Sequence, residues 1–104
     1  MTNFLSALKA RLNDYKKAQG LTYFDYFEVS VQEGSKYAKV FRHEMKNGAE
    51  FGSRSLVCFV EKSTGNILKA ASFAAPAKGI RGNINSEQNG MEAFDQSGYI
   101  IYFR

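Results

Sequence analysis

The spacing of apolar residues changes near Gly20, and this change limits the folds that the chain can adopt. Before Gly20, apolar side chains recur at the interval of an α-helix. This apolar stripe consists of Phe4, Leu5, Leu8, Leu12 and Tyr15. From residue 23 onward apolar and polar residues alternate, which is typical of a strand with one buried face. The pattern predicts an amphipathic helix over residues 3–19, capped by Thr2 or Asn3 and ended by Gly20, followed by a sheet.

The polar side of this helix is basic at Lys9, Lys16 and Lys17, so a helix on a membrane surface is the alternative. Asp14 among these lysines and the short apolar stripe favour packing on a sheet instead. No stretch approaches the roughly 20 apolar residues of a membrane span. The first residues lack the basic start and the apolar run of a signal peptide. We therefore expect no membrane partner and no secretion by a signal peptide.

The alternating segment predicts a first β-hairpin. It consists of strands over residues 23–33 and 36–46, joined by a two-residue turn at Gly34-Ser35. The predicted pairs are Val31 with Ala38 and Val29 with Val40, and these four residues form a core face with Phe27. The opposite face carries Tyr26, Glu28, Tyr37, Lys39, Phe41 and His43.

Two further strands complete a predicted meander. They cover residues 54–62 and 66–72, with a Ser63-Thr64-Gly65 loop in which Gly65 is left-handed. The predicted pairs are Val60 with Leu68 and Cys58 with Ala70. Residues 99–103 predict a last strand, beside either the first or the fourth. The fold class predicted is α+β: an N-terminal helix packed on a four- or five-stranded antiparallel meander sheet, cystatin-like in layout.

The length and the scarcity of cysteine and histidine exclude several classes of protein. A chain of 104 residues is enough for a single domain, residues 1–104, with one core. One cysteine, Cys58, excludes an internal disulfide and a zinc site built from several cysteines. One histidine, His43, excludes a two-histidine metal site, so we expect no metal and no cofactor. A cytoplasmic setting fits this low cysteine content.

The sequence gives little support for catalysis. His43 has no nucleophile motif or paired carboxylates beside it in the sequence, and Glu28 could approach it only diagonally across the first hairpin. Cys58 lies on the predicted core face, where a cysteine acts as a small hydrophobe rather than as a reactive thiol. We therefore predict that the protein is not an enzyme.

The segment over residues 73–97 is long for a loop in so small a domain, and long ordered loops often carry function. Its basic part combines glycines, which let backbone amides approach a phosphate, with cationic side chains. The candidate residues there are Lys78, Arg81 and Asn83, interspersed with Gly79 and Gly82. The G-K-[ST] ending of a P-loop is absent, so nucleotide hydrolysis is not predicted. The alternative is a structural crossover in which the glycines make turns and Arg81 pairs with an acid.

Aromatic residues on the second face of the first hairpin form another candidate site. Tyr37 and Phe41 alternate there with Lys39, a combination typical of surfaces that stack bases and bind phosphates of single-stranded nucleic acid. The net charge of +4 favours polyanionic partners only weakly. The same rings could instead be covered by the 73–97 segment or by a second copy of the chain, because an open aromatic face promotes aggregation.

Two motifs lie close together in the second half of the chain. They are the hairpin sequence FVEKSTGNI, residues 59–67, and the sequence PAKGIRGNI, residues 76–84. Together they resemble a small protein type of marine bacteriophages, including phages of cyanobacteria. This resemblance implies a location in the host cytoplasm or in the virion, and it implies no catalytic residue.

Two functional hypotheses follow from the sequence. The first is a small binding or accessory protein of phage type that contacts nucleic acid. Its candidate residues are Lys78, Arg81, Asn83, Lys39, Tyr37 and Phe41. The second is a protein–protein interaction module that forms a homodimer, or binds a host or virion protein, through the aromatic face or an exposed edge strand.

Overall fold

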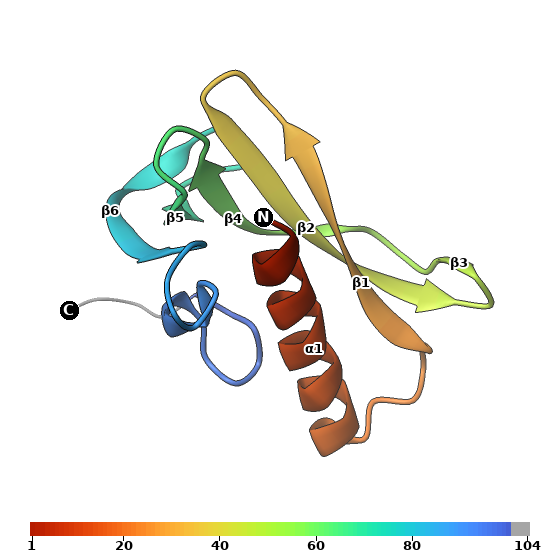
Figure 1. Ribbon diagram of the computed structural model, residues 1–104. Helices are drawn as coiled ribbons and strands as arrows, with labels where there is room; N and C mark the ends of the chain where they lie inside the picture. Colours follow the sequence, from red (N-terminus) through yellow and green to blue (C-terminus); the bar gives the residue numbers. More distant parts are fainter. Residues whose placement is uncertain (101–104) are drawn as a thin grey trace.

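Helix α1 (Thr2–Gln19) packs on one face of an antiparallel sheet in the computed structural model, which describes residues 1–100 (Figure 1). The predicted apolar stripe faces the sheet, and its fully buried members are Phe4, Leu8 and Leu12. The helix begins after Met1, and no side chain among the described residues caps it, so the predicted capping by Thr2 or Asn3 is wrong. Gly20 ends the helix with a left-handed φ of 64°, as expected for a glycine at this position.

Each strand of the sheet runs antiparallel to its neighbours. The strands are β1 (Tyr26–Glu33), β2 (Tyr37–Lys46), β3 (Ala49–Glu50), β4 (Ser55–Glu61), β5 (Asn66–Ala70) and β6 (Pro76–Asn83). Their spatial order is β1-β2-β4-β5-β6, and the short β3 pairs with the end of β2. This arrangement confirms the predicted α+β class, an N-terminal helix on an antiparallel meander.

The first hairpin has a different register from the predicted one. The observed pairs are Val31 with Val40 and Val29 with Arg42, in place of Val31 with Ala38 and Val29 with Val40. The predicted two-residue turn is wrong because the connection is longer, and the N–H of Gly34 donates to the carbonyl of Tyr37 at 3.0 Å. The shift is even, so every side chain keeps its predicted face. Val29 and Val31 therefore still pack against the core below α1.

The second hairpin differs from the prediction by one residue. The observed pairs are Phe59 with Leu68 and Val60 with Ile67, so the predicted pairs of Val60 with Leu68 and Cys58 with Ala70 are wrong. The loop between β4 and β5 is one residue longer than predicted, although Gly65 is left-handed as expected, with a φ of 79°. A one-residue shift exchanges the faces, so Ile67 joins the core below α1 in place of Leu68.

Part of the expected 73–97 loop is a strand. β6 pairs with β5, so for these residues the expected crossover is wrong. After β6 the chain turns to the helix side of the sheet, where a short 3₁₀ helix, η1 (Met91–Ala93), lies beside α1 (Figure 1). Of the predicted last strand, Ile100 forms a single bridge with Phe94, and residues 101–103 lie outside the described part of the chain.

Apolar side chains are buried on both faces of the sheet. The main core lies between the sheet and a layer formed by α1 and residues 91–100, and it contains Cys58 as predicted. A smaller set of buried residues, Phe41, Phe59 and Leu68, alternates with these core residues along the strands and therefore faces the other side. This second side of the sheet is where the predicted aromatic face lies.

Candidate functional site

The side of the sheet opposite α1 carries a cluster of aromatic rings and cations, which we call the open face. It comprises Tyr37, Lys39, Phe41, Arg54, Phe59 and Phe73. The ring centroids of Phe41 and Phe73 are 5.9 Å apart, and the guanidinium carbon of Arg54 lies 4.0 Å from the centroid of Phe41. Phe41 is fully buried beneath these two side chains, whereas Phe73 is 57% exposed.

Lys39 links the rings of the open face. Its Nζ lies 4.1 Å from the ring centroid of Phe73 and 5.9 Å from that of Phe59. Tyr37 packs edge-on against Phe59, with centroids 6.0 Å apart and planes at 88°. An ammonium over a ring at an exposed site gains about 0.5–1 kcal/mol, so Lys39 is held in place while its charge stays close to the surface. The open face therefore presents an exposed ring beside a positioned positive charge.

The structure brings three of the predicted site residues together, because Tyr37, Lys39 and Phe41 all lie on the open face. Phe41 supports this surface from below, since its ring is buried under Phe73. This contact corresponds to the alternative in which the 73–97 segment covers the aromatic residues. The sequence analysis did not identify Phe73 and Arg54 as site residues. Both lie outside the strands, Arg54 directly before β4 and Phe73 after β5, and carry no local signal of their contacts with Phe41.

The predicted residues of the basic segment lie on β6 in three different settings. Lys78 is exposed next to Gly79, which has a φ of 103° and lies in a bulge of the strand. Arg81 is half-buried. Asn83 belongs to the framework, since its Nδ2 donates to the carbonyl of Thr64 at 2.9 Å and so ties β6 to the β4–β5 loop. Of the three, Lys78 is the residue best exposed for contact with an external anion.

The acidic segment after β6 folds back to Asn83. The carboxylate of Glu92 accepts from the backbone N–H of Asn83 at 2.9 Å and from Ser86 Oγ at 2.6 Å. Burial alone would raise the pKa of Glu92, but these hydrogen bonds outweigh that effect and lower it. A charged carboxylate therefore sits at this end of β6, which makes the surroundings of Asn83 unfavourable for a phosphate.

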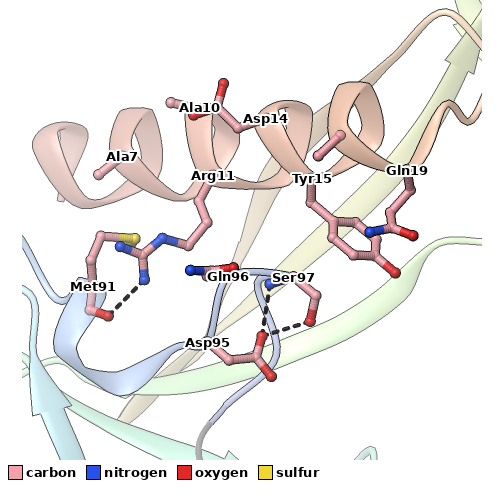
Figure 2. A pocket seen from close by; sticks show the side chains of 11 residues that line it. Ala7, Ala10, Arg11, Asp14, Tyr15, Gln19, Met91, Asp95, Gln96 and Ser97 are labelled. Carbon is pink, nitrogen blue, oxygen red and sulfur yellow. Dashed lines mark hydrogen bonds between the residues drawn. The ribbon is translucent and has the colours of Figure 1, made fainter.

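An open groove of about 880 Å³ lies on the other side of the sheet, between α1 and the segment around η1 (Figure 2). Arg11 reaches across it and donates to the carbonyls of Met91 at 2.9 Å and Phe94 at 3.0 Å. Asp95 accepts from Ser97 Oγ at 2.6 Å. Burial alone would raise the pKa of Asp95, but hydrogen bonds from Ser97 and its neighbours lower it. Arg11 thus joins α1 to the η1 segment, and Asp95 stabilises the turn that follows η1.

The remaining chemistry of the described chain is limited. Within residues 1–100, no group of three or more His, Cys, Asp or Glu side chains is placed to hold a metal ion. The same residues contain no helix that is both long and apolar enough to cross a membrane. Burial raises the pKa of the Cys58 thiol, so this cysteine stays protonated in the folded protein.

Comparison with protein families gives a match over almost the whole chain. A family described as "Family of unknown function (DUF7717)" matches residues 2–103, and the chain belongs to this family. No curated protein and no solved structure matches the chain. The family description gives no activity, so the resemblance to phage proteins and both functional hypotheses stay predictions.

Proposed function

We propose that the protein binds single-stranded nucleic acid on the open face, with a base stacked on Phe73 and phosphates bound by Lys39 and Arg54 there and by the exposed Lys78 of β6. The observation that carries this proposal is the contact between Lys39 and Phe73, in which the ammonium lies 4.1 Å from the centroid of a largely exposed ring. Aromatic faces stack bases of every type, and nearby cations follow the backbone, which is the usual composition of single-strand binding surfaces.

An unpaired strand fits this surface better than a duplex does. Proteins read a duplex with a helix or a two-stranded ribbon that enters the major groove. In residues 1–100 the helices lie on the opposite side of the sheet, so the open face offers strand surface and rings. Tyr37 extends this ring surface along β2 through its edge contact with Phe59. The bases of a single strand are already accessible, so they can stack directly on such exposed rings.

The charge distribution around the open face also favours an anionic ligand. Glu28, whose side chain faces the same side of the sheet as Lys39, pairs with Lys9 at 2.5 Å rather than with a cation of the open face. The contact of Arg54 to a neighbouring amide on β1 is long, at 3.4 Å. The positive charges of the open face are therefore available to phosphates, which release counterions when they bind.

The test is binding of labelled single-stranded DNA and RNA oligonucleotides, followed by fluorescence anisotropy at several salt concentrations. Affinity should fall with added salt, and Lys39→Ala or Lys78→Ala should each reduce the slope of log affinity against log salt by about one. Phe73→Ala removes a stacking partner, so it should weaken binding by about 1–3 kcal/mol at every salt concentration.

The end of β2 supplies a matched control outside the open face. Lys46 Nζ lies 5.2 Å from the ring centroid of Phe51, which is 40% exposed. Lys46→Ala and Phe51→Ala remove the same chemical groups, and both variants should bind as the wild type does. Absence of binding to both oligonucleotides at low salt would contradict the proposal, and so would equal losses in the control variants.

The interaction-module hypothesis has one specific observation in its favour. β6 is an edge strand of the sheet that residues 1–100 form, and its Ile80 is 58% exposed. An edge strand with exposed apolar side chains can pair with the same strand of a second copy or with another protein. In sedimentation experiments a homodimer of this kind should dissociate in the variant Ile80→Asp, whereas a wild type that is monomeric at high concentration would reject the homodimer.

A further inference from the structure

A second cluster of chemical groups lies on the same side of the sheet, around β1 and outside the residues used above. Ser30 Oγ lies 2.5 Å from His43 Nε2, and His43 Nδ1 is hydrogen-bonded to a carboxylate oxygen of Glu50. The three residues come from β1, β2 and β3. The order of hydroxyl, imidazole and carboxylate is the one that activates a serine for nucleophilic attack.

The hydrogen-bonding capacity of each group determines which atom donates and which accepts in this serine–histidine–glutamate relay. A carboxylate can only accept, so Nδ1 of His43 carries a proton and donates a hydrogen bond to Glu50. In the neutral imidazole Nε2 is then an acceptor, and the hydroxyl of Ser30 donates to it. His43 is therefore oriented as a general base toward Ser30, and Glu50 holds the required tautomer.

The surroundings of the relay are compatible with this role. The side chain of His43 is 11% exposed, so its ring is held by its neighbours, while that of Glu50 is 59% exposed. Gln32 lies two residues beyond Ser30 on β1 and so faces the same side. Arg54 donates to the amide oxygen of Gln32 at 3.4 Å, so its guanidinium lies beside β1 on this side of the sheet.

We propose that Ser30 is a nucleophile that is acylated by activated carboxylic esters. Its Oγ forms a bond to the carbonyl carbon while Nε2 of His43 takes the hydroxyl proton. The bond from this carbon to the leaving alcohol then breaks, and the alcohol takes the proton from Nε2. Water repeats the sequence on the acyl-serine, which releases a carboxylic acid and restores Ser30. The sum is ester plus water giving acid plus alcohol.

The position of the relay limits the class of ester. The three side chains lie on a sheet face, and none of them lines the groove between α1 and the η1 segment or a smaller groove at Met1 and Ile84. A closed cleft with several fixed donors is what lowers the barrier for poor leaving groups such as amides. Aryl esters, whose leaving groups need little assistance, are therefore the expected substrate class.

Labelling of the folded, full-length chain with an alkyl fluorophosphonate tests the proposal. This reagent exchanges its fluoride for an activated serine oxygen and leaves a stable adduct. We expect one adduct per chain, assigned to Ser30 by peptide mass spectrometry, and none in Ser30→Ala. His43→Gln should slow labelling by about 100-fold or more, because the general base is lost. Glu50→Gln should slow it by about tenfold or more, because the imidazole loses its orienting partner.

Ser86 provides an internal control in the same spectra. Its Oγ donates to the carboxylate of Glu92 at 2.6 Å, but the single histidine of the chain is engaged with Ser30, so the Ser86 peptide should stay unmodified. Circular dichroism establishes that each variant is folded. The proposal is overturned if the folded wild type forms no adduct at Ser30. It is equally overturned if urea-unfolded protein, or folded His43→Gln, is labelled as fast as the folded wild type.

Discussion

Asn13 of α1 forms hydrogen bonds with both backbone groups of Phe27 on β1. Its Nδ2 donates to the carbonyl of Phe27 at 3.1 Å, and its Oδ1 accepts from the N–H of Phe27 at 2.8 Å. β1 is an edge strand, and these outward-facing groups are those that a further strand would bind. A single amide side chain therefore protects part of this edge and fixes α1 relative to the sheet.

Replacement of Asn13 should destabilise the fold more than its size suggests. Asn13→Ala leaves a partly buried N–H and carbonyl of Phe27 without partners, so the free energy of unfolding should fall by about 1–3 kcal/mol. Urea denaturation measures this change. Asn13→Asp keeps the acceptor for the N–H but turns a carboxylate oxygen toward the carbonyls of Phe27 and Lys9, so it should not restore the lost stability. Asn3→Ala, at an exposed position of the same helix, should stay within about 0.5 kcal/mol of the wild type. A loss in Asn13→Ala no larger than in Asn3→Ala would contradict the role of this contact.

Gly90 is a position where an added methyl group should be poorly tolerated. Its φ is 86°, and a Cβ there would lie 2.7 Å from Cδ1 of Phe4 and 2.8 Å from Cδ1 of Ile67. Gly90→Ala should therefore cost about 2 kcal/mol or more, from backbone strain and overpacking together. Gly52 has a φ of 82° but no described atom within 4 Å of its Cβ position, so Gly52→Ala should show strain alone, about 1 kcal/mol. If thermal denaturation shows the same loss of stability in Gly90→Ala and Gly52→Ala, the core around Gly90 adapts to the methyl group.

The elements with strong periodicity could be predicted from the sequence. The helical apolar stripe around Leu8 and the alternating apolar residues around Val29 each form one buried face of their element. The spacing of apolar residues in the sequence therefore predicts which of these side chains are buried. β6 was missed because Gly79, Gly82 and a starting proline are unfavourable in strands and interrupt the alternation. This strand forms because it can pair with the free edge of β5, and the sequence of residues 76–83 alone does not indicate that pairing.

Strand register and long-range contacts could not be predicted in the same way. Register depends on the length of each turn, and the sequence Gly34-Ser35 is compatible with more than one turn. The observed register puts Glu28 directly opposite His43 and moves Ser30 into the diagonal position that the predicted register gave to Glu28, and so the contact between Ser30 and His43 was missed. Phe73 was missed for a different reason: β3, β4 and β5 lie between Phe41 and Phe73 along the chain, so no local pattern indicates their contact.

Low pH should weaken the hydrogen bonds that connect the end of β6 to the segment that follows it. Burial opposes ionisation of Glu92, but hydrogen bonds from Ser86 and from the backbone of Asn83 lower its pKa below the ordinary value of 4.5. A lowered pKa means that the contribution of Glu92 to stability is present above pH 4.5 and is lost as the pH falls through the folded-state pKa. The free energy of unfolding, measured by urea denaturation across this range, should decrease accordingly.

Glu92→Gln tests the origin of this pH dependence. The variant keeps an acceptor oxygen but has no titrating group, so it should be less stable than the wild type at neutral pH and should lose less stability on acidification. Glu87→Gln, at an exposed position of the same segment, should keep the pH dependence of the wild type. If the free energy of unfolding of Glu92→Gln decreases with falling pH as steeply as that of the wild type, other carboxyl groups, Asp95 first among them, cause the pH dependence.

Cys58 should be inert toward thiol reagents while the protein is folded. Its side chain is completely buried on β4, and this burial raises its pKa above the ordinary value of 9.0, so the reactive thiolate does not form. Labelling with a chromogenic disulfide at neutral pH should therefore be slow in native buffer and rapid in urea. Rapid, complete labelling of the native protein would contradict the burial of this side chain.

The same burial predicts a loss of stability at alkaline pH. Above pH 9.0 the unfolded chain releases the thiol proton while the folded chain retains it, so the unfolded state is favoured increasingly as the pH rises. Cys58→Ala removes this contribution, and its free energy of unfolding should fall less steeply above pH 9.0 than that of the wild type, although a small cavity lowers its stability at every pH. Because the cost of the cavity does not depend on pH, the difference between the two slopes of unfolding free energy against pH gives the contribution of the thiol. Equal slopes would show that the thiol is ionised to the same extent in the folded and unfolded states.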